Sequence, residues 1–488
     1  MTIAQQPDAW RPFGMATIDL GGIANADNLS AEAAWYAGLL VDEYAAHAPH
    51  NEMLRRYYDG RVSVSDYGVG AEIANDQTCH WPAKAVDALA DRITFNGFSV
   101  PDSLDPEVAD ALAEIERENN LANSYNSHLT PKLLYGCCAA TVTRNQTGRA
   151  VVRFHSADTF TAIPSPDGKD GVVAAGMAIA RVERVPWGGP APVPTVVNLH
   201  LPGNVVELRQ VAAGEWVASD GLTPEPEPSL YVFTHDGTGS LNAFGRTRVN
   251  RYVRTLTDDA IRCMWHMQIS GAYYSIPKLL MLNLMPDQYE AVIGDKFKYQ
   301  LDRVIATEVD ESGETTTEIK QLTGNTPQPF VEELRALACQ FSGATGVPLN
   351  SLGIVQDNPS SAEAIGAARE DICLIANRDI KEDRPVLRRV AIAALAVQLN
   401  TTTRRLLDEH PELMDLSARF DSPVLHSYGE ISNFVTQVSA VRDGFGNTDY
   451  AARLLGVPDE ELEGVKSDEV RAASSAAFNA LFSGGGEA

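Results

Sequence analysis

The cysteines and histidines are the side chains of this chain best suited to bind a metal or to act as nucleophiles. The six cysteines include no pair with C-x-x-C spacing, which is typical of zinc sites and dithiol redox sites. Cys137 and Cys138 are adjacent, and two small buried residues explain such a pair better than a disulfide does. His47 and His50 are the closest of ten histidines, and no ligand set surrounds them in the sequence. We therefore expect no metal and no cofactor.

Other catalytic signatures are absent or incomplete. The sequence contains no G-x-x-x-x-G-K-[ST] phosphate-binding loop, no H-E-x-x-H and no G-x-S-x-G. The run DGKDG over 167–171 resembles a calcium loop, but it lacks the spacing and the closing glutamate, so a hairpin turn is the better interpretation. We predict that the protein is not an enzyme. A hydrolase with dispersed site residues is the alternative, and activity screening of alanine variants would reveal it.

The net charge of the chain restricts the partners that it can bind tightly. Its 488 residues include 39 lysines and arginines against 65 aspartates and glutamates, a formal net charge of -26. Proteins that hold DNA statically neutralise its phosphates with basic side chains, so the composition argues against a repressor or a DNA-compacting protein. A channel through which DNA slides is compatible with this charge. Solubility alone would also explain it.

Hydropathy predicts a chain that is neither exported nor inserted into a membrane. The amino terminus lacks the basic start and the apolar run of a signal peptide. No stretch reaches the roughly 18 to 20 uncharged apolar residues that span a bilayer. We expect synthesis and assembly in a cytoplasm. With 44% hydrophobic residues, the chain can form an extensive core.

Apolar spacing predicts helices toward both ends of the chain and strands in its middle. Residues 1–30 are polar and rich in glycine, which is typical of a flexible arm. Helices are expected over about 30–60, 82–93 and 105–118. From about 139 to 236, β-branched runs alternate with turn residues and predict a mostly antiparallel β insertion. The expected fold class is mixed α+β and mainly helical.

Two further helices are expected, one over about 248–275 with apolar residues on several faces and one over 329–346 with apolar residues on one face. A helix that is apolar on several faces is buried on several sides. The covering surface is either the core of the same chain or a neighbouring subunit of an oligomer. The side chains that we expect at contacts between subunits are Met264, Trp265, Tyr273 and Phe341.

A hairpin and an acidic carboxy-terminal segment are also predicted. Residues 304–309 and 316–320 have the composition of strands and enclose a turn, as in a hairpin. From about residue 404 the pattern is helical. Residues 408–488 carry 15 acidic and five basic side chains, a net charge of about -10. Residues 481–488 are rich in glycine and are expected to be disordered.

A long helix is expected over 361–403, with a bend at Pro385 because proline removes a backbone donor. Arg384, Arg388 and Arg389 lie beside this bend. They could contact DNA or acidic side chains of a neighbouring subunit. We expect contacts between subunits, because the chain is so acidic.

The order of these parts and four short motifs resemble the portal proteins of tailed bacteriophages, in particular the SPP1-like group. The motifs are LRRYYDG over 54–60, KAVDALADR over 84–92, GVPLNSLG over 346–353 and NPSSAEAI over 358–365. The resemblance extends over nearly the whole chain, and none of the motifs is catalytic. It implies a portal fold with parts that are called wing, stem, clip, tunnel loop and crown, assembling as a ring of about twelve subunits.

The resemblance also assigns each part to a range of residues. The wing would comprise residues 31–247, including the β insertion, and the long helix over 361–403. The stem helices would span 248–275 and 329–346, the clip 276–328, the tunnel loop 347–360 and the crown 404–480.

Several partners are implied by the resemblance. They are the terminase large subunit, the major capsid and scaffolding proteins, the head-completion or connector proteins, and double-stranded DNA that passes without sequence specificity. The location would be a unique capsid vertex of the virion, after assembly in the host cytoplasm. Another virion component, such as a capsid or tail protein, is the alternative. A twelve-fold ring with an axial hole in electron micrographs would favour the portal.

The expected tunnel loop contains no lysine or arginine and one acid. An electronegative channel would keep a duplex centred within the roughly 8 to 10 Å reach of screened charges. We therefore expect a lumen with few exposed basic side chains. Without the resemblance, an ordinary surface connection would be the better interpretation of this loop. The residues expected to face DNA are Leu349, Asn350, Ser351, Gln356, Asp357 and Asn358.

The expected clip mixes charges of both signs. Such mixtures fix the register of a partner more than they add affinity. We expect a docking surface formed by Asp295, Lys296, Lys298, Arg303, Glu308 and Glu311. A solvated hairpin explains the same residues equally well.

Overall fold

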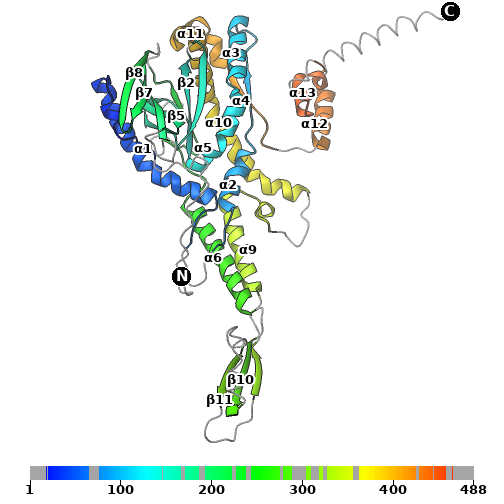
Figure 1. Ribbon diagram of the computed structural model, residues 1–488. Coiled ribbons are helices and arrows are strands. Elements are labelled where there is room, and N and C mark those ends of the chain that lie inside the picture. Colours follow the sequence, from blue (N-terminus) through cyan, green and yellow to red (C-terminus); the bar gives the residue numbers. More distant parts are fainter. Residues whose placement is uncertain are drawn as a thin grey trace, which may run out of the picture. The chain divides into compact units, whose positions relative to one another are not determined.

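The computed structural model describes most of the chain in two units (Figure 1). The described residues are 18, 20–64, 76–145, 147–165, 171–185, 193–222, 227–237, 243–274, 278–287, 304–308, 318–322, 327–354, 362–424, 428–442, 444–457 and 464. The first unit is Met1–Pro423 and the second is Val424–Ala488. Among the described residues, no helix combines the length and the apolar character that crossing a bilayer requires. The mixed, mainly helical fold class is confirmed.

Five helices open the first unit. They are α1 (Ala31–Tyr58), α2 (Trp81–Ala90), α3 (Pro106–Glu118), α4 (Leu121–Ser127) and α5 (Leu129–Tyr135). Side-chain caps fix two of their starts. The Ser30 hydroxyl accepts a hydrogen bond from the Ala33 N–H at 3.2 Å, and the Asp105 carboxylate accepts one from the Glu107 N–H at 2.9 Å. Each cap satisfies a backbone donor that the first helical turn leaves free.

The segment just before α1 is folded against the protein. It contains η1 (Ile23–Asn25), and Leu20 and Ile23 are buried in the same apolar cluster as strands of the β insertion. The indole N–H of Trp216 donates to the Gly21 carbonyl at 3.2 Å. The prediction of a flexible arm is therefore wrong for residues 20–30, because two apolar side chains outweigh the polar composition. Residues 1–17 lie outside the described part.

Eight antiparallel strands form two sheets in the middle of the chain. The strands are β2 (Cys137–Arg144), β3 (Ala150–Ser156), β4 (Phe160–Pro164), β5 (Val173–Glu183), β6 (Val193–Leu201), β7 (Asn204–Ala212), β8 (Glu215–Leu222) and β9 (Leu230–Thr234). One sheet has the order β3-β2-β9 and the other β4-β5-β6-β7-β8. The α1 helix packs on the five-stranded sheet, where Ala33, Ala37 and Leu40 share a cluster with strand residues.

Strand β2 is buried on both faces, which explains its small side chains. Because side chains alternate across a strand, Cys138 and Ala140 join the cluster formed with the helices, whereas Cys137 and Ala139 join a second cluster with β4, β5 and β9. The two neighbouring cysteines thus point to opposite sides, and both are free thiols.

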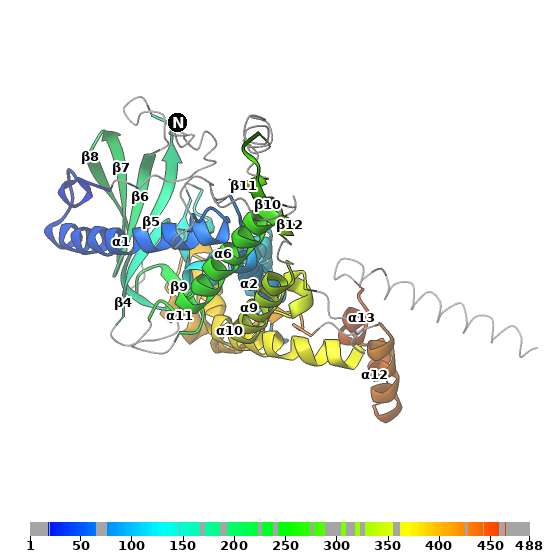
Figure 2. The ribbon, with the colours of Figure 1, turned by 90° about the horizontal axis from the view of Figure 1, so that it is seen from below.

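The α6 helix (Arg251–Tyr274) and the α9 helix (Gln328–Thr345) lie side by side, as Figures 1 and 2 both show. A three-stranded sheet is formed from the segment between them, with β10 (Lys278–Leu284), β11 (Val304–Glu308) and β12 (Glu318–Leu322) in the order β11-β10-β12. The predicted hairpin of 304–309 with 316–320 is wrong. The apolar run of β10 lies between these two strands, parallel to β11 and antiparallel to β12.

The α10 helix (Ala362–Gln398) runs as one helix through Pro385. It is preceded by η3 (Leu349–Leu352) and followed by α11 (Thr403–Glu409), η4 (Pro411–Asp415) and β13 (Ser417–Phe420). Strand β13 pairs antiparallel with β1 (Phe95–Ser99). The start of the expected crown near 404 is therefore corrected, since residues up to 423 belong to the first unit and include a strand.

The second unit is helical where it is described. It contains α12 (Tyr428–Val441), η5 (Phe445–Asn447) and α13 (Asp449–Leu454). The ring of Phe445 lies 6.3 Å from that of Phe434 and 6.1 Å from that of Tyr450, measured between centroids. These aromatic contacts join the three elements.

Candidate functional site

The α6 and α9 helices are joined to each other and to α2 by specific contacts. The Cys263 thiol donates to the Phe330 carbonyl at 3.3 Å, and the Tyr252 hydroxyl donates to the amide oxygen of Gln340 at 3.2 Å. The rings of Trp81 and Phe341 have centroids 5.2 Å apart. The α6 and α9 helices are thus packed against each other within one chain.

The structure places the side chains predicted at subunit contacts in different environments. Trp265 is 3% exposed and Phe341 is fully buried within one chain. The assignment of these two to contacts with another subunit is corrected, because their faces are already covered by the same chain. Met264 is half-buried against the core. Tyr273 lies in α6, and its side chain is outside the described part.

The loop after α9 begins with a glycine in a conformation that other residues disfavour. Gly346 has φ of 71°, and its N–H donates to the Ser342 carbonyl at 2.8 Å, which ends the helix. In η3, Leu349 and Leu352 pack against the core, whereas Asn350 and Ser351 are exposed. This exposed tip is polar and uncharged. Residues Gln356, Asp357 and Asn358 lie outside the described part.

Arg248 joins the start of α6 and the end of α9 to α2. This side chain precedes α6, and its guanidinium donates to the Thr345 carbonyl at 2.7 Å and to the Ala85 carbonyl at 3.2 Å. Burial lowers the pKa of Arg248 to about 10, against the opposing charge of Asp379. The group remains a cation at neutral pH. It fixes the point from which the loop departs.

A buried ion pair holds the middle of α10. The Lys132 ammonium of α5 lies 2.6 Å from the Asp383 carboxylate, and the two side chains are 0% and 1% exposed. The Tyr125 hydroxyl of α4 donates to the same carboxylate oxygen. Burial alone would lower the pKa of Lys132, but the charges of Asp383 and Asp379 outweigh burial and raise it above its ordinary value. Lys132 is therefore a charged structural group and not a nucleophile.

One helical turn earlier, Asp379 makes a second buried contact. His235, just after β9, has its Nδ1 atom 2.9 Å and 2.8 Å from the two carboxylate oxygens of Asp379. Burial would raise the pKa of Asp379, but the charge of Lys132 and the hydrogen bond to His235 outweigh it and lower the pKa. Two acids spaced four residues apart thus fix one face of α10 to α4, α5 and β9.

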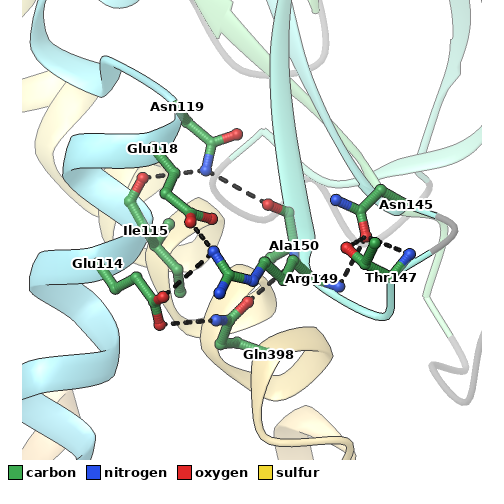
Figure 3. A network of polar contacts seen from close by, with 9 residues as sticks. All are labelled: Glu114, Ile115, Glu118, Asn119, Asn145, Thr147, Arg149, Ala150 and Gln398. Atoms are coloured by element: carbon green, nitrogen blue, oxygen red, sulfur yellow. Dashed lines mark hydrogen bonds and ion pairs between the residues drawn. The ribbon is translucent and has the colours of Figure 1, made fainter.

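A third set of contacts, drawn in Figure 3, holds the end of α10. The Gln398 side chain accepts a hydrogen bond from the Ala150 N–H at 3.0 Å and donates to Glu114 of α3 at 3.1 Å. Arg149 lies between Glu114, at 3.3 Å, and Glu118. Three elements that are distant in the sequence are thereby joined at one helix end.

Replacing Gln398 with alanine should lower the free energy of unfolding by about 1–3 kcal/mol. The substitution removes the partner of the Ala150 N–H, and an unsatisfied backbone donor carries a penalty of about this size. Urea-induced unfolding followed by circular dichroism would measure the change. Gln437→Ala on α12, where the side chain is exposed, serves as the control and should change the free energy by less than about 0.5 kcal/mol. Equal stability of the two variants would contradict the role of Gln398.

The three arginines near Pro385 all have contacts within the chain. The Arg384 guanidinium lies 6.0 Å from the centroid of the Phe420 ring. Arg388 donates to the Met414 carbonyl at 2.7 Å, and Arg389 lies 3.8 Å from the Glu227 carboxylate. Pairing with a second subunit stays a prediction for these side chains.

The predicted clip surface falls almost wholly outside the described residues. Glu308 ends β11, but its side chain is not among those described. Asp295, Lys296, Lys298, Arg303 and Glu311 lie in stretches that are not described. In the part of the chain that is described, no group of three or more histidine, cysteine or acidic side chains has the arrangement of a metal site.

Sequence reasoning missed the buried charged groups that position α10 and the end of α9. These are Lys132, His235, Arg248, Asp379 and Asp383. The one available signal was the spacing of the two aspartates, which places charges among the apolar positions of a helix. This arrangement has a structural role, because its charged groups are neutralised and buried instead of lining an accessible cavity. It holds a long helix whose amino-terminal end follows the loop after α9.

Comparison with known proteins supports the resemblance that the motifs predict. The chain is 31% identical over 164 residues to the portal protein of Mycobacterium phage D29, a match that covers 32% of each chain. It is 30% identical over 128 residues to the portal protein of Mycobacterium phage L5, covering 26% of this chain and 25% of the relative. The aligned part thus spans about a third or less of these relatives. No protein-family model matches.

Among solved structures, one similar chain comes from the neck of a native GTA particle computed with C12 symmetry. Its TM-score is 0.40 at 14% identity, covering 84% of this chain and 93% of that chain. The predicted resemblance to phage portal proteins is confirmed in sequence, by the two mycobacteriophage relatives.

Proposed function

We propose that this chain is the portal protein of a tailed bacteriophage, a ring-forming and non-enzymatic conduit for double-stranded DNA. The observation that carries the proposal is the sequence identity of about 30% with two mycobacteriophage portal proteins. The order of helices, β insertion, paired helices, loop and long helix supports it.

In this proposal each part of the chain has its own role in the ring. The α6–α9 pair forms the stem, the sheet of β10, β11 and β12 belongs to the clip, and the segment around η3 is the tunnel loop. The uncharged side chains of Asn350 and Ser351 suit a surface past which phosphates move. A net charge of -26 per chain would repel the duplex from the walls rather than hold it.

The partners follow from the same proposal. The clip would dock the terminase large subunit during packaging and the head-completion or connector proteins afterwards. The wing and stem would contact the major capsid and scaffolding proteins at one vertex of the virion. Assembly would take place in the host cytoplasm.

Ring formation is the direct test. The purified full chain, alone or with capsid and scaffolding proteins, should give particles with about twelve-fold symmetry and an axial hole in negative-stain class averages. A ring follows from the need to surround a duplex symmetrically. A monomer under every assembly condition would contradict the proposal. Closed shells or helical tubes of this chain would instead favour a capsid or tail protein.

A further inference from the structure

The second unit leaves most of its described apolar side chains uncovered. Four of them, spaced by three and four residues, share one face of α12, called here the α12 face: Ile431, Phe434, Val438 and Val441. None of the four is buried, and Phe434 is 49% and Val441 90% exposed. Of the residues in this unit that the structure describes, Ala451 alone is buried. The α12 face therefore lacks a cover among them.

A helical unit of this size needs a cover to be stable. Its described helices lie within about 30 residues, and fewer than about 40 residues rarely bury enough apolar surface to fold without a staple or a partner. Residues 424–488 contain no cysteine, so a disulfide staple within the unit is excluded. The Phe445 ring contacts that of Phe434 but leaves it half exposed. The α12 face is thus a binding surface whose occupant lies outside the described helices.

A segment of the same chain has the complementary pattern. In residues 467–482, the apolar residues Val470, Ala477, Phe478 and Leu481 recur with the spacing of one helical face, before the glycine run at 484–486. As a helix this segment would be about 24 Å long, and α12 is about 21 Å long at 1.5 Å per residue. The two faces match in length and in apolar character.

The position of this segment in the chain favours it over any separate molecule. Residues 458–466 connect it to the end of the described helices, and a connection of that length reaches about 30 Å when extended. So short a tether holds two surfaces at an effective concentration of about millimolar. A free partner would have to be present at a similar concentration to compete.

Charge also selects among the possible occupants. A nucleic acid needs basic side chains for its phosphates, and the four residues of the α12 face are uncharged. A second copy would approach with a net charge of -26 on each chain. The tethered segment begins with Asp468 and Glu469, and Arg442 is exposed beside Val441 at the end of α12. These opposite charges favour the segment over both other occupants.

We propose that residues 467–482 bind as a helix to the α12 face of the same chain and so complete the second unit as a small helical bundle. Phe478 and Leu481 would lie against Phe434 and Val441. The proposal does not require the chain to be a portal protein, because it depends on the second unit alone.

Hydrogen–deuterium exchange of the full chain, followed by mass spectrometry, tests the proposal. Leu481→Asp places a charge in the proposed contact and should speed the exchange of the α12 amides about tenfold or more. Ala472→Asp adds the same charge nine residues earlier, on the opposite side of the proposed helix, and should leave the exchange unaltered. A synthetic peptide of residues 467–482, added in excess, should restore slow exchange in Leu481→Asp.

Four results would overturn the proposal. They are equal exchange of α12 in the two variants, a faster exchange in Leu481→Asp that the peptide does not reverse, and unprotected α12 amides in the parent chain. The fourth is exchange in the parent chain that slows as the protein concentration rises, which would assign the α12 face to a contact with a second copy.

Discussion

Replacing Lys132 with methionine should lower the free energy of unfolding by about 3–5 kcal/mol, the largest effect expected of any single substitution described for this chain. The reason is that Asp383 loses the positive charge that neutralises it. Asp383 is fully buried, and removing one member of a buried ion pair leaves an uncompensated charge in a medium that solvates it poorly. Methionine keeps much of the volume, so the loss reports the charge more than the packing.

The pH dependence of this loss gives a second measurement. Burial raises the pKa of Asp383 above its ordinary value even beside Lys132, and loss of the lysine should raise this pKa further. A carboxyl group with a raised folded pKa destabilises the protein at high pH; the penalty declines as the pH falls through the folded pKa and is gone below the unfolded pKa. The difference between Lys132→Met and the parent chain should therefore be larger at pH 7 than at pH 5.

Urea unfolding at the two pH values would measure both effects. Lys84→Met is the matched control, because Lys84 is exposed on α2, and it should change the free energy by less than about 0.5 kcal/mol. A loss for Lys132→Met no larger than that of the control would show that the pair does not anchor α10. A loss independent of pH would assign it to packing.

Introducing two lysines at the tip of the loop, Asn350→Lys with Ser351→Lys, should reduce the yield of DNA-filled particles about tenfold or more. Both side chains are exposed, so the substitutions should leave the fold intact. In a ring of about twelve copies they would add about 24 positive charges around the duplex. Each neutralised phosphate releases counterions and tightens the attachment of DNA, so a duplex that must slide would be held.

The measurement is the infectious titre and the DNA content of particles from a phage that carries each variant. Asn350→Gln with Ser351→Thr is the matched control, since it alters size without charge and should package normally. Rings of normal appearance must form in both variants. Normal packaging by the lysine variant would show that this segment does not line the channel. The proposed portal function, which is tested by ring formation, would be unaffected by that result.

Local signals in the sequence predicted most helices and missed the strands β1, β10 and β13. Ser30 and Gly346 mark a helix start and a helix end through interactions confined to a few neighbouring residues. Strand β10 was missed although its run KLLMLNL is apolar, because its partners lie more than 20 residues later in the chain. Its insertion between β11 and β12 depends on tertiary pairing, which composition does not specify.

The candidate site could be predicted only in part, because some of its features also depend on tertiary contacts. The uncharged character of Asn350 and Ser351 can be read from the sequence, and the structure places both at the surface. The burial of Trp265 and Phe341 within one chain could not be distinguished from burial between chains, since both require the same apolar pattern. The pairing of Lys132 with Asp383 joins residues 251 positions apart and is created only by the fold.

The spacing of the contacts along α10 has a geometric consequence for the loop. Ile372 is the first residue of α10 whose described side chain is buried, and it lies about 15 Å from the start of the helix at 1.5 Å per residue. A tilt of about 5° at Ile372 would move the loop end of the helix by about 1 Å. The bore of a ring built from such helices would respond to substitutions that never touch its lining.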